Sequence, residues 1–444
     1  MKIQISDHFT NKKLFQFVFP SIAMMIFTSI YGVVDGYFVS NFTGKTPFAA
    51  VNIIMPFIML LGGVGFMIGT GGSALVAKVL GEGNRKRAQS LFSLMVYTTI
   101  ALGLLLSVIG ELSVEKIAVF LGADSSMLDY CVVYARISFI SLSFFMLQNV
   151  FQSFFVVAQK PNLGLFVTVL AGVINMVLDF VFVGLFKWGI DGAALATMTS
   201  EFIGGGIPLI YFSRKNTSLL RLTSAEFDVK ALLKAFTNGS SEMLTNISMS
   251  IVNMVFNHQL IRLYGENGVA AYGVIMYANF VFSAVFFGYS IGVAPIIGYN
   301  YGAKNHKELQ NVYKKSMVFN GSVGFGITIG AMLLSGTVAK IFVYYDASLL
   351  ELTSFAFCLF STRYCLSGFN IFSSSFFTAL NNGGVSAIIS FMRNLVFQLS
   401  AVILLPMIFG ASSIWLSMTV CEIFSLAICA FFLVTQNKKY HYAK

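Results

Sequence analysis

Residues 71–89, GGSALVAKVLGEGNRKRAQ, return in outline 221 residues later as GVAPIIGYNYGAKNHKELQ at residues 292–310. The two segments share two glycines ten residues apart and, further on, an asparagine, a lysine and a glutamine in register. The same shift relates further identical pairs, namely Gly44 and Gly265, Ala50 and Ala271, Gly103 and Gly324, Gly189 and Gly410, Leu195 and Leu416, and Glu201 and Glu422. A constant offset with no gap indicates one unit of roughly 220 residues that is present twice.

Both copies are very apolar. Of the 444 residues, 57% are hydrophobic and 10% are charged, and the mean hydropathy is +0.80. Soluble domains carry about 25% charged residues. A water-soluble fold cannot bury this much apolar surface, so lipid must be the solvent for most of the chain. A repeated, apolar unit is typical of a two-lobed transporter.

We predict twelve membrane-spanning helices, six in each copy. A hydrocarbon core of about 30 Å requires about 20 helical residues, and each apolar stretch is long enough. The stretches lie near residues 14–40, 48–77, 90–110, 130–157, 163–184 and 191–212, and near 235–261, 269–299, 316–334, 349–378, 385–408 and 414–435. The sequence therefore predicts an all-α integral membrane protein. Because six is an even number, the two lobes share one orientation and are related by an axis along the membrane normal.

The basic residues are unevenly distributed between the two sides. Most of the 28 Lys and Arg residues lie in the terminal segments and in the even-numbered connections between spans. The opposite side carries only Lys45, Lys116, Lys187, Arg262 and Lys340. Basic loops stay in the cytoplasm, so both termini are expected to be cytoplasmic. The net charge of +10 is then a signal of topology, and we expect no nucleic-acid partner.

We divide the chain into an N-terminal lobe at 1–212, a cytoplasmic linker at 213–234 and a C-terminal lobe at 235–444. In the linker, residues 228–236 place apolar side chains at helical spacing opposite lysines, which predicts a short interfacial helix. Among the prolines, Pro20 lies about four turns before Asp35 on the same predicted helix. We expect Pro20 to be a kink that moves during transport.

Three polar residues of the first lobe have no counterpart in the second. Asp35, Asn175 and Asp179 lie within predicted spans, where charge is costly and persists for a reason. Their partners at +221 are Phe256, Val396 and Ser400. Asn175 and Asp179 are four residues apart and share a helical face. Oxygen ligands of this kind suit Na⁺, and two neighbouring buried carboxylates would equally hold a proton. The alternative is that the two aspartates lie far apart and each bonds only to backbone.

Other charged residues also fall within spans. Glu201 and Glu422 occupy equivalent places in the two copies, and a feature kept twice suits symmetric bracing of each bundle by hydrogen bonds. Direct participation in coupling is the alternative. Glu242, Arg363 and Arg393 place charge of both signs in the second lobe, where a substrate cavity could use it. Arg136 lies near the end of its span and is expected to reach the interface.

No set of residues suggests catalysis. The sequence lacks a GxGxxG segment, a P-loop and an HExxH segment, and its four histidines offer no catalytic set. We therefore expect a protein that is not an enzyme and that needs no cofactor beyond a coupling ion.

Four segments resemble one family. They are Phe19-Pro20 with YGVVDGYFV at 31–39, AKVLGEGN at 77–84, GIDGAALAT at 189–197 and GVAPIIGYNYGA at 292–303. In this order, with twelve spans, they resemble the multidrug and toxic compound extrusion (MATE) family, in its bacterial DinF/MepA-like branch. The resemblance implies a V-shaped pair of six-helix lobes in the bacterial cytoplasmic membrane. It also implies that Asp35, Asn175 and Asp179 bind the coupling ion, together with Thr197 on the sixth helix.

Two functions follow as hypotheses. The first is a secondary active antiporter that exports small amphipathic, often cationic drugs or metabolites in exchange for H⁺ or Na⁺, as a monomer embedded in the lipid bilayer. The second is a flippase for a lipid-linked anionic glycan. A flippase would need Arg or Lys in the first-lobe cavity to hold a diphosphate, and the predicted spans of that lobe contain only Arg136, near a helix end.

Overall fold

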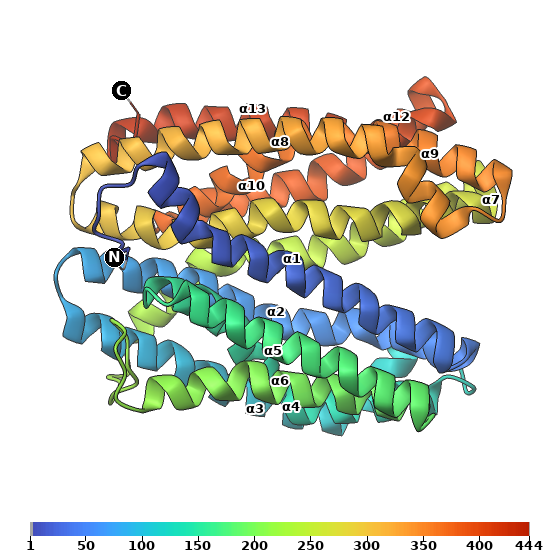
Figure 1. The fold of residues 1–444 in the computed structure, drawn as a ribbon, viewed down its shortest axis with the longest axis horizontal. Coiled ribbons are helices and arrows are strands. Elements are labelled where there is room, and N and C mark those ends of the chain that lie inside the picture. The colour runs from blue at the N-terminus through green and yellow to red at the C-terminus, as the bar shows by residue number, and fades with distance from the viewer. Residues whose placement is uncertain (1–2, 444) are drawn as a thin grey trace.

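The computed structural model describes residues 3–443, which contain long helices and, within that range, no strand. The helices of the first lobe are α1 (Asn11–Phe42), α2 (Lys45–Gly81), α3 (Arg85–Phe120), α4 (Leu128–Val157), α5 (Pro161–Asp179) with the π-turn Phe180–Leu185, and α6 (Gly189–Ser213). Those of the second are α7 (Val229–Gly302), α8 (His306–Val343), α9 (Ala347–Ser361), α10 (Tyr364–Ala379), α11 (Gly383–Phe391) with the π-turn Met392–Phe397, α12 (Gln398–Phe409), the 3₁₀ turn Ala411–Leu416, and α13 (Ser417–Tyr440). Figure 1 shows α3 and α4 on one side of the molecule, α8 and α13 on the other, and both termini at the same end.

Helix α7 supplies two of the twelve crossings. Its 74 residues would extend about 110 Å as a straight rod, far beyond one membrane. The chain instead reverses at Gly265, where φ is 63°. The two arms pack together, because the rings of Phe256 and Tyr272 stack with centroids 4.3 Å apart and Tyr272 donates to Asn253 at 2.9 Å. Ten helices are long and apolar enough to cross a membrane, and the bent pair α9 and α10 adds one more span. Because α7 counts twice, the described residues contain twelve spans, which confirms the prediction.

The repeated glycines and asparagines have physical roles in the turns. Gly265 and its equivalent Gly44 both adopt positive φ, which a side chain would strain. Asn84 accepts a hydrogen bond from the Arg87 backbone at 3.0 Å and so caps α3. Its equivalent Asn305 caps α8 through the Glu308 backbone at 3.2 Å. The offset of 221 therefore preserves the residues that reverse the chain and begin the helices.

The two lobes meet at the end that carries the termini. A Cβ on Gly81 would lie 2.0 Å from the Tyr299 carbonyl oxygen, and one on Gly302 would lie 2.0 Å from that of Lys78. Gly81 and Gly302 are repeat equivalents, as are Lys78 and Tyr299. The contact is therefore the same on both sides, as at a two-fold interface.

Crossed segments reinforce this contact. The segment before α1 reaches the other lobe, where Phe9 N–H donates to Glu308 at 2.9 Å and His8 Nδ1 lies 2.6 Å from the same carboxylate. The linker before α7 reaches the first lobe, where Arg87 pairs with Asp228 and with Glu226. Arg87 and Glu308 are again repeat equivalents.

The interfacial helix predicted at 228–236 is not a separate element. The backbone is helical without a break from Val229, so these residues form the first two turns of α7. Ala231 and Ala235 are buried, and Gly71 of α2 packs against the Ala235 carbonyl. The apolar face that suggested membrane contact thus packs against the first lobe. Helix α1 passes through Pro20 as one continuous helix, and the moving kink stays a prediction.

Replacing Gly302 with alanine should weaken the inter-lobe contact. The added Cβ must displace the Lys78 backbone, and overpacking of this kind costs about 1–3 kcal/mol. We expect populations to shift roughly 5–150-fold toward lobes parted at this end. Pulsed electron paramagnetic resonance between labels at the exposed Lys86 and Lys307 measures the distance. Gly326→Ala is the control, because a Cβ there meets no atom within 4 Å. An unchanged distance distribution in Gly302→Ala would contradict the prediction.

Candidate functional site

Two aspartates of the first lobe face each other. Asp35 lies on α1, and Asn175 and Asp179 lie one turn apart on α5. Asp35 and Asp179 lie close enough for the charge of one carboxyl group to act on the other. Asp179 is fully buried, and Asn175 is 2% exposed. The structure therefore brings together the three polar residues that the second copy lacks.

Oxygens of this cluster lack partners. Both carboxylate oxygens of Asp179, Oδ1 of Asp35 and Oδ1 of Asn175 are buried and accept no hydrogen bond from residues 3–443. The Thr197 hydroxyl on α6 is also buried and has no hydrogen-bond partner within residues 3–443. Buried polar groups are ordinarily paired, and the exceptions call for an explanation. A bound cation or proton would satisfy them.

Close packing of α1 against α5 brings the aspartates together. A Cβ on Gly172 of α5 would lie 2.6 Å from the Phe27 ring and 2.8 Å from the Tyr31 ring, both on α1. Sequence reasoning missed Tyr134 on α4, which is 1% exposed and lies within electrostatic reach of Asp35 and Asp179. A tyrosine in an apolar span is common, and only the tertiary structure singles this one out.

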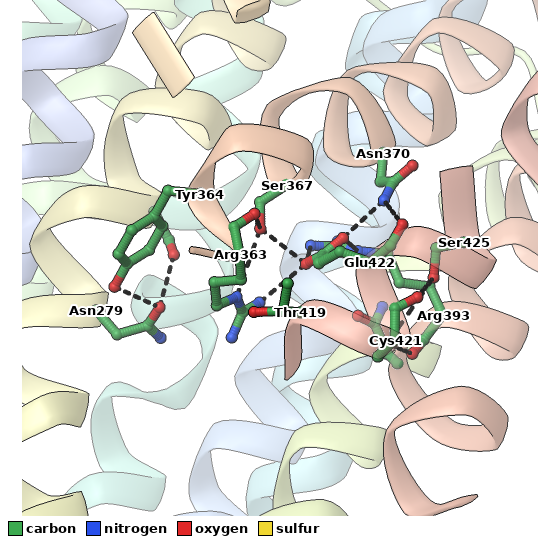
Figure 2. A network of polar contacts seen from close by, with 12 residues as sticks. Asn279, Arg363, Tyr364, Ser367, Asn370, Arg393, Thr419, Cys421, Glu422 and Ser425 are labelled. Carbon is green, nitrogen blue, oxygen red and sulfur yellow. Dashed lines mark hydrogen bonds and ion pairs between the residues drawn. The ribbon is translucent and has the colours of Figure 1, made fainter. Parts of the chain in front are cut away.

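In the second lobe, Glu422 is held by two arginines. Arg393 binds its carboxylate through two nitrogens, Nη2 to Oε1 at 2.7 Å and Nε to Oε2 at 3.0 Å. Arg363 Nη2 donates to Oε1 at 3.1 Å, and Ser367 and Asn370 donate at 2.8 and 2.7 Å. Figure 2 shows the Glu422 carboxylate at the centre of this network. We call these five residues the Glu422 brace.

The two arginines occupy irregular backbone. Arg363 lies between α9 and α10, which are bent by 47°. Arg393 lies in the π-turn Met392–Phe397. Irregular helix segments often occur at functional sites. The fourth helix of the first lobe, α4, has no such break, and it carries Leu142 at the position equivalent to Arg363.

Glu201 is buried at the position equivalent to Glu422, but its surroundings differ. It is 8% exposed and has no arginine partner among the described residues. It lies near Ser141 and Asp35 instead. The two glutamates are symmetric in sequence, whereas only Glu422 has a charged brace.

A cavity lies between the lobes and contains the other predicted charges. Its volume is about 310 Å³, and Glu242, Arg363 and Arg393 line it. Most of its wall comes from the second lobe, and Phe66, Thr70 and Ser73 of α2 contribute from the first. Volumes of about 300–1,000 Å³ are usual for small-molecule sites. Arg136 lies elsewhere, half-exposed, with its Nε 3.0 Å from Glu111, and its reach to the membrane interface stays a prediction.

Comparison with known proteins places these features in a family. The MatE family model matches residues 20–181 and again 242–404, once in each copy of the repeat. The chain is 25% identical to the multidrug export protein MepA of Staphylococcus haemolyticus over 422 residues, which is 95% of this chain and 91% of that protein. The chain is 23% identical to MepA of Staphylococcus aureus strain MRSA252. That alignment covers 94% of this chain and 91% of that protein.

Solved structures share the fold. An outward-facing multidrug resistance MATE transporter of the MOP superfamily superposes with a TM-score of 0.92 at 20% identity, covering 98% of this chain and 97% of that one. A MOP superfamily transporter from Pyrococcus furiosus, described as having a binding pocket of reverse polarity, gives a TM-score of 0.89 at 20% identity with the same coverage. The family match covers most of the chain in two copies, and the expected V-shaped, two-lobed membrane fold is confirmed. The chain therefore belongs to the MatE family of multidrug and toxic compound extrusion transporters.

Proposed function

We propose that this protein is a secondary active antiporter that exports small amphipathic, often cationic compounds in exchange for H⁺ or Na⁺. The observation that carries the proposal is the pair of neighbouring carboxylates, Asp35 and Asp179, whose buried oxygens accept no hydrogen bond from residues 3–443. Two such carboxylates cannot both remain charged in a buried site without a cation or a proton between them. Relatives named as multidrug export proteins support the choice of substrates.

The residues fit a monovalent ion. Asp35, Asp179, the Asn175 side-chain oxygen and the Thr197 hydroxyl are oxygen donors, which hard cations prefer. No group of three His, Cys, Asp or Glu side chains is placed to hold a metal ion in the part of the chain that the structure describes. The site therefore suits a proton or Na⁺ better than a divalent metal.

Coupling requires that the ion and the substrate favour different lobe arrangements. The lobes are in contact at the end with the termini, where Gly81 packs against Tyr299 and Gly302 packs against Lys78. We place this end in the cytoplasm because basic residues concentrate there. Ion binding between α1 and α5 would then favour one arrangement and substrate in the inter-lobe cavity the other, by differential affinity.

The lipid-linked glycan flippase is the weaker alternative. Its diphosphate would need basic residues in the first lobe, and the arginines that line the cavity, Arg363 and Arg393, belong to the second. The multidrug export relatives do not favour it either.

Transport of ethidium in proteoliposomes tests the proposal. We expect an imposed Na⁺ or proton gradient to drive ethidium across the membrane against its own gradient. One of the two ions alone should suffice, and that result identifies the coupling ion. Ethidium movement that follows neither gradient would refute antiport.

A further inference from the structure

The Glu422 brace contains one more positive charge than its carboxylate balances. Two guanidinium groups, Arg363 and Arg393, share the single carboxylate of Glu422. Both side chains are about nine-tenths buried, with exposed fractions of 10% and 8%. A buried charge is costly unless it is paired. One positive charge of this group therefore calls for an anion from outside the brace.

Unused hydrogen-bond donors show where such an anion would bind. Arg393 donates to Glu422 through Nε and Nη2, and Arg363 donates through Nε to Ser367 at 3.4 Å and through Nη2 to Glu422. Nη1 of each guanidinium has no hydrogen-bond partner within residues 3–443, and neither atom is sealed from the surface. Both arginines line the inter-lobe cavity. The free nitrogens are thus available to a ligand there.

The second arginine is not a requirement of the repeated fold. The first lobe has Leu142 and Gly172 at the positions equivalent to Arg363 and Arg393, and it buries Glu201 with no arginine paired to it in the part of the chain that the structure describes. The break between α9 and α10, absent from α4, is what places Arg363 at mid-span. The excess charge is therefore specific to the Glu422 brace and is not a property of the repeated fold.

A negative charge lies on the same cavity. Glu242 of α7 lines it and forms no hydrogen bond or ion pair with any described residue. It lies near the arginines, because Asn394, next to Arg393, donates at 2.9 Å to Thr245, three residues after Glu242. Met249, Met276 and Phe280 add apolar wall that accommodates flat rings.

We propose that Arg363 and Arg393 form a carboxylate-binding subsite, so that the cavity selects amphipathic zwitterions with the carboxylate at the arginines and the cationic group at Glu242. Arginine suits this role because its planar donors match a carboxylate. The proposal rests on the proposed function in taking this cavity as the substrate site, and it adds a substrate class to it.

Two dyes that differ only at the carboxylate test the proposal. Rhodamine 110 is a zwitterion, and rhodamine 123 is its methyl ester and a cation. Binding to the purified full-length protein is measured by fluorescence anisotropy in detergent without an ion gradient. We expect Arg363→Gln to weaken rhodamine 110 binding by roughly 10–150-fold, the range for a lost hydrogen bond to a charged group, and to leave rhodamine 123 binding unchanged or tighter.

Matched variants separate a subsite from a structural effect. Arg136→Gln makes the same change at a half-exposed arginine remote from the cavity and should alter neither dye. Glu242→Gln should weaken both dyes. Equal loss of both dyes in Arg363→Gln, or no loss of either, would overturn the proposal. If Arg363→Gln does not fold, the affinities of the wild-type protein for the two dyes still test the proposal. Equal affinity for rhodamine 110 and rhodamine 123 would refute the subsite.

The two proposals can fail separately. Acid-selective binding without gradient-driven export would leave the subsite standing and refute antiport. Gradient-driven export with no discrimination between the two dyes would support antiport and refute the subsite.

Discussion

Asp179→Asn should abolish ion-driven export while leaving the protein folded. The Asp179 carboxylate is fully buried, faces Asp35 and has no hydrogen-bond partner among residues 3–443. Asparagine preserves its shape and removes the charge that a cation or proton requires. Loss of one charged ligand is expected to weaken ion binding by roughly 10–150-fold, which removes the difference in affinity that drives coupling. Asp35→Asn should act in the same way.

Proteoliposomes with imposed Na⁺ or proton gradients measure this effect. Export by either variant should fall to the level of protein-free vesicles, and the thermal midpoint in detergent should be unchanged or higher, because an unpaired buried charge has been removed. Asp191→Asn, at an exposed aspartate in the first turn of α6, is the matched control and should export normally. Wild-type export by both cluster variants would show that these carboxylates are not the coupling site.

Glu422→Gln should greatly lower the free energy of unfolding, unlike the two aspartate variants, which should stay at least as stable as the wild type. Glu422 is fully buried and accepts hydrogen bonds from Arg363, Arg393, Ser367 and Asn370. Removing its charge leaves two buried guanidinium groups without a counter-charge. Breaking a buried ion pair in this way costs about 3–5 kcal/mol.

The repeat provides the matched control for this change. Glu201→Gln alters the equivalent residue, which has no arginine partner within residues 3–443, and should change the free energy of unfolding far less. Denaturation of both variants in detergent, followed by tryptophan fluorescence, measures the difference. Equal stability of the two variants would contradict the role of the Glu422 brace. The double variant that combines Glu422→Gln with Arg363→Gln should be more stable than Glu422→Gln alone, because one uncompensated charge is then removed. That result would support the role of the Glu422 brace.

The sequence was sufficient to predict the membrane fold and the cluster of polar residues in the first lobe. Apolar length gave the spans, and the constant offset gave the two lobes. The cluster of Asp35, Asn175 and Asp179 was predictable because lipid makes charge costly and because the second copy lacks all three. The prediction of a separate interfacial helix at 228–236 was wrong. A short segment with one apolar face has the same sequence pattern whether lipid or a neighbouring helix covers that face.

Other residues of the two sites could not be found in this way. The break at Arg363 contains no proline or glycine, so no local signal marks it. Tyr134 and the unlike surroundings of Glu201 and Glu422 depend on contacts between helices far apart in the chain.

What the amino-acid sequence alone determined was which segments enter the membrane, how many times, and where one copy of the repeat departs from the other. These properties depend on each segment's own free energy of transfer from water to lipid. What only the tertiary structure decided was which buried charges meet. Asp179 lies near another carboxylate and accepts no hydrogen bond from the described residues, whereas the Glu422 carboxylate is bound by two arginines. The energy of a buried charge depends on neighbours a few ångströms away, and the packing of the helices selects those neighbours.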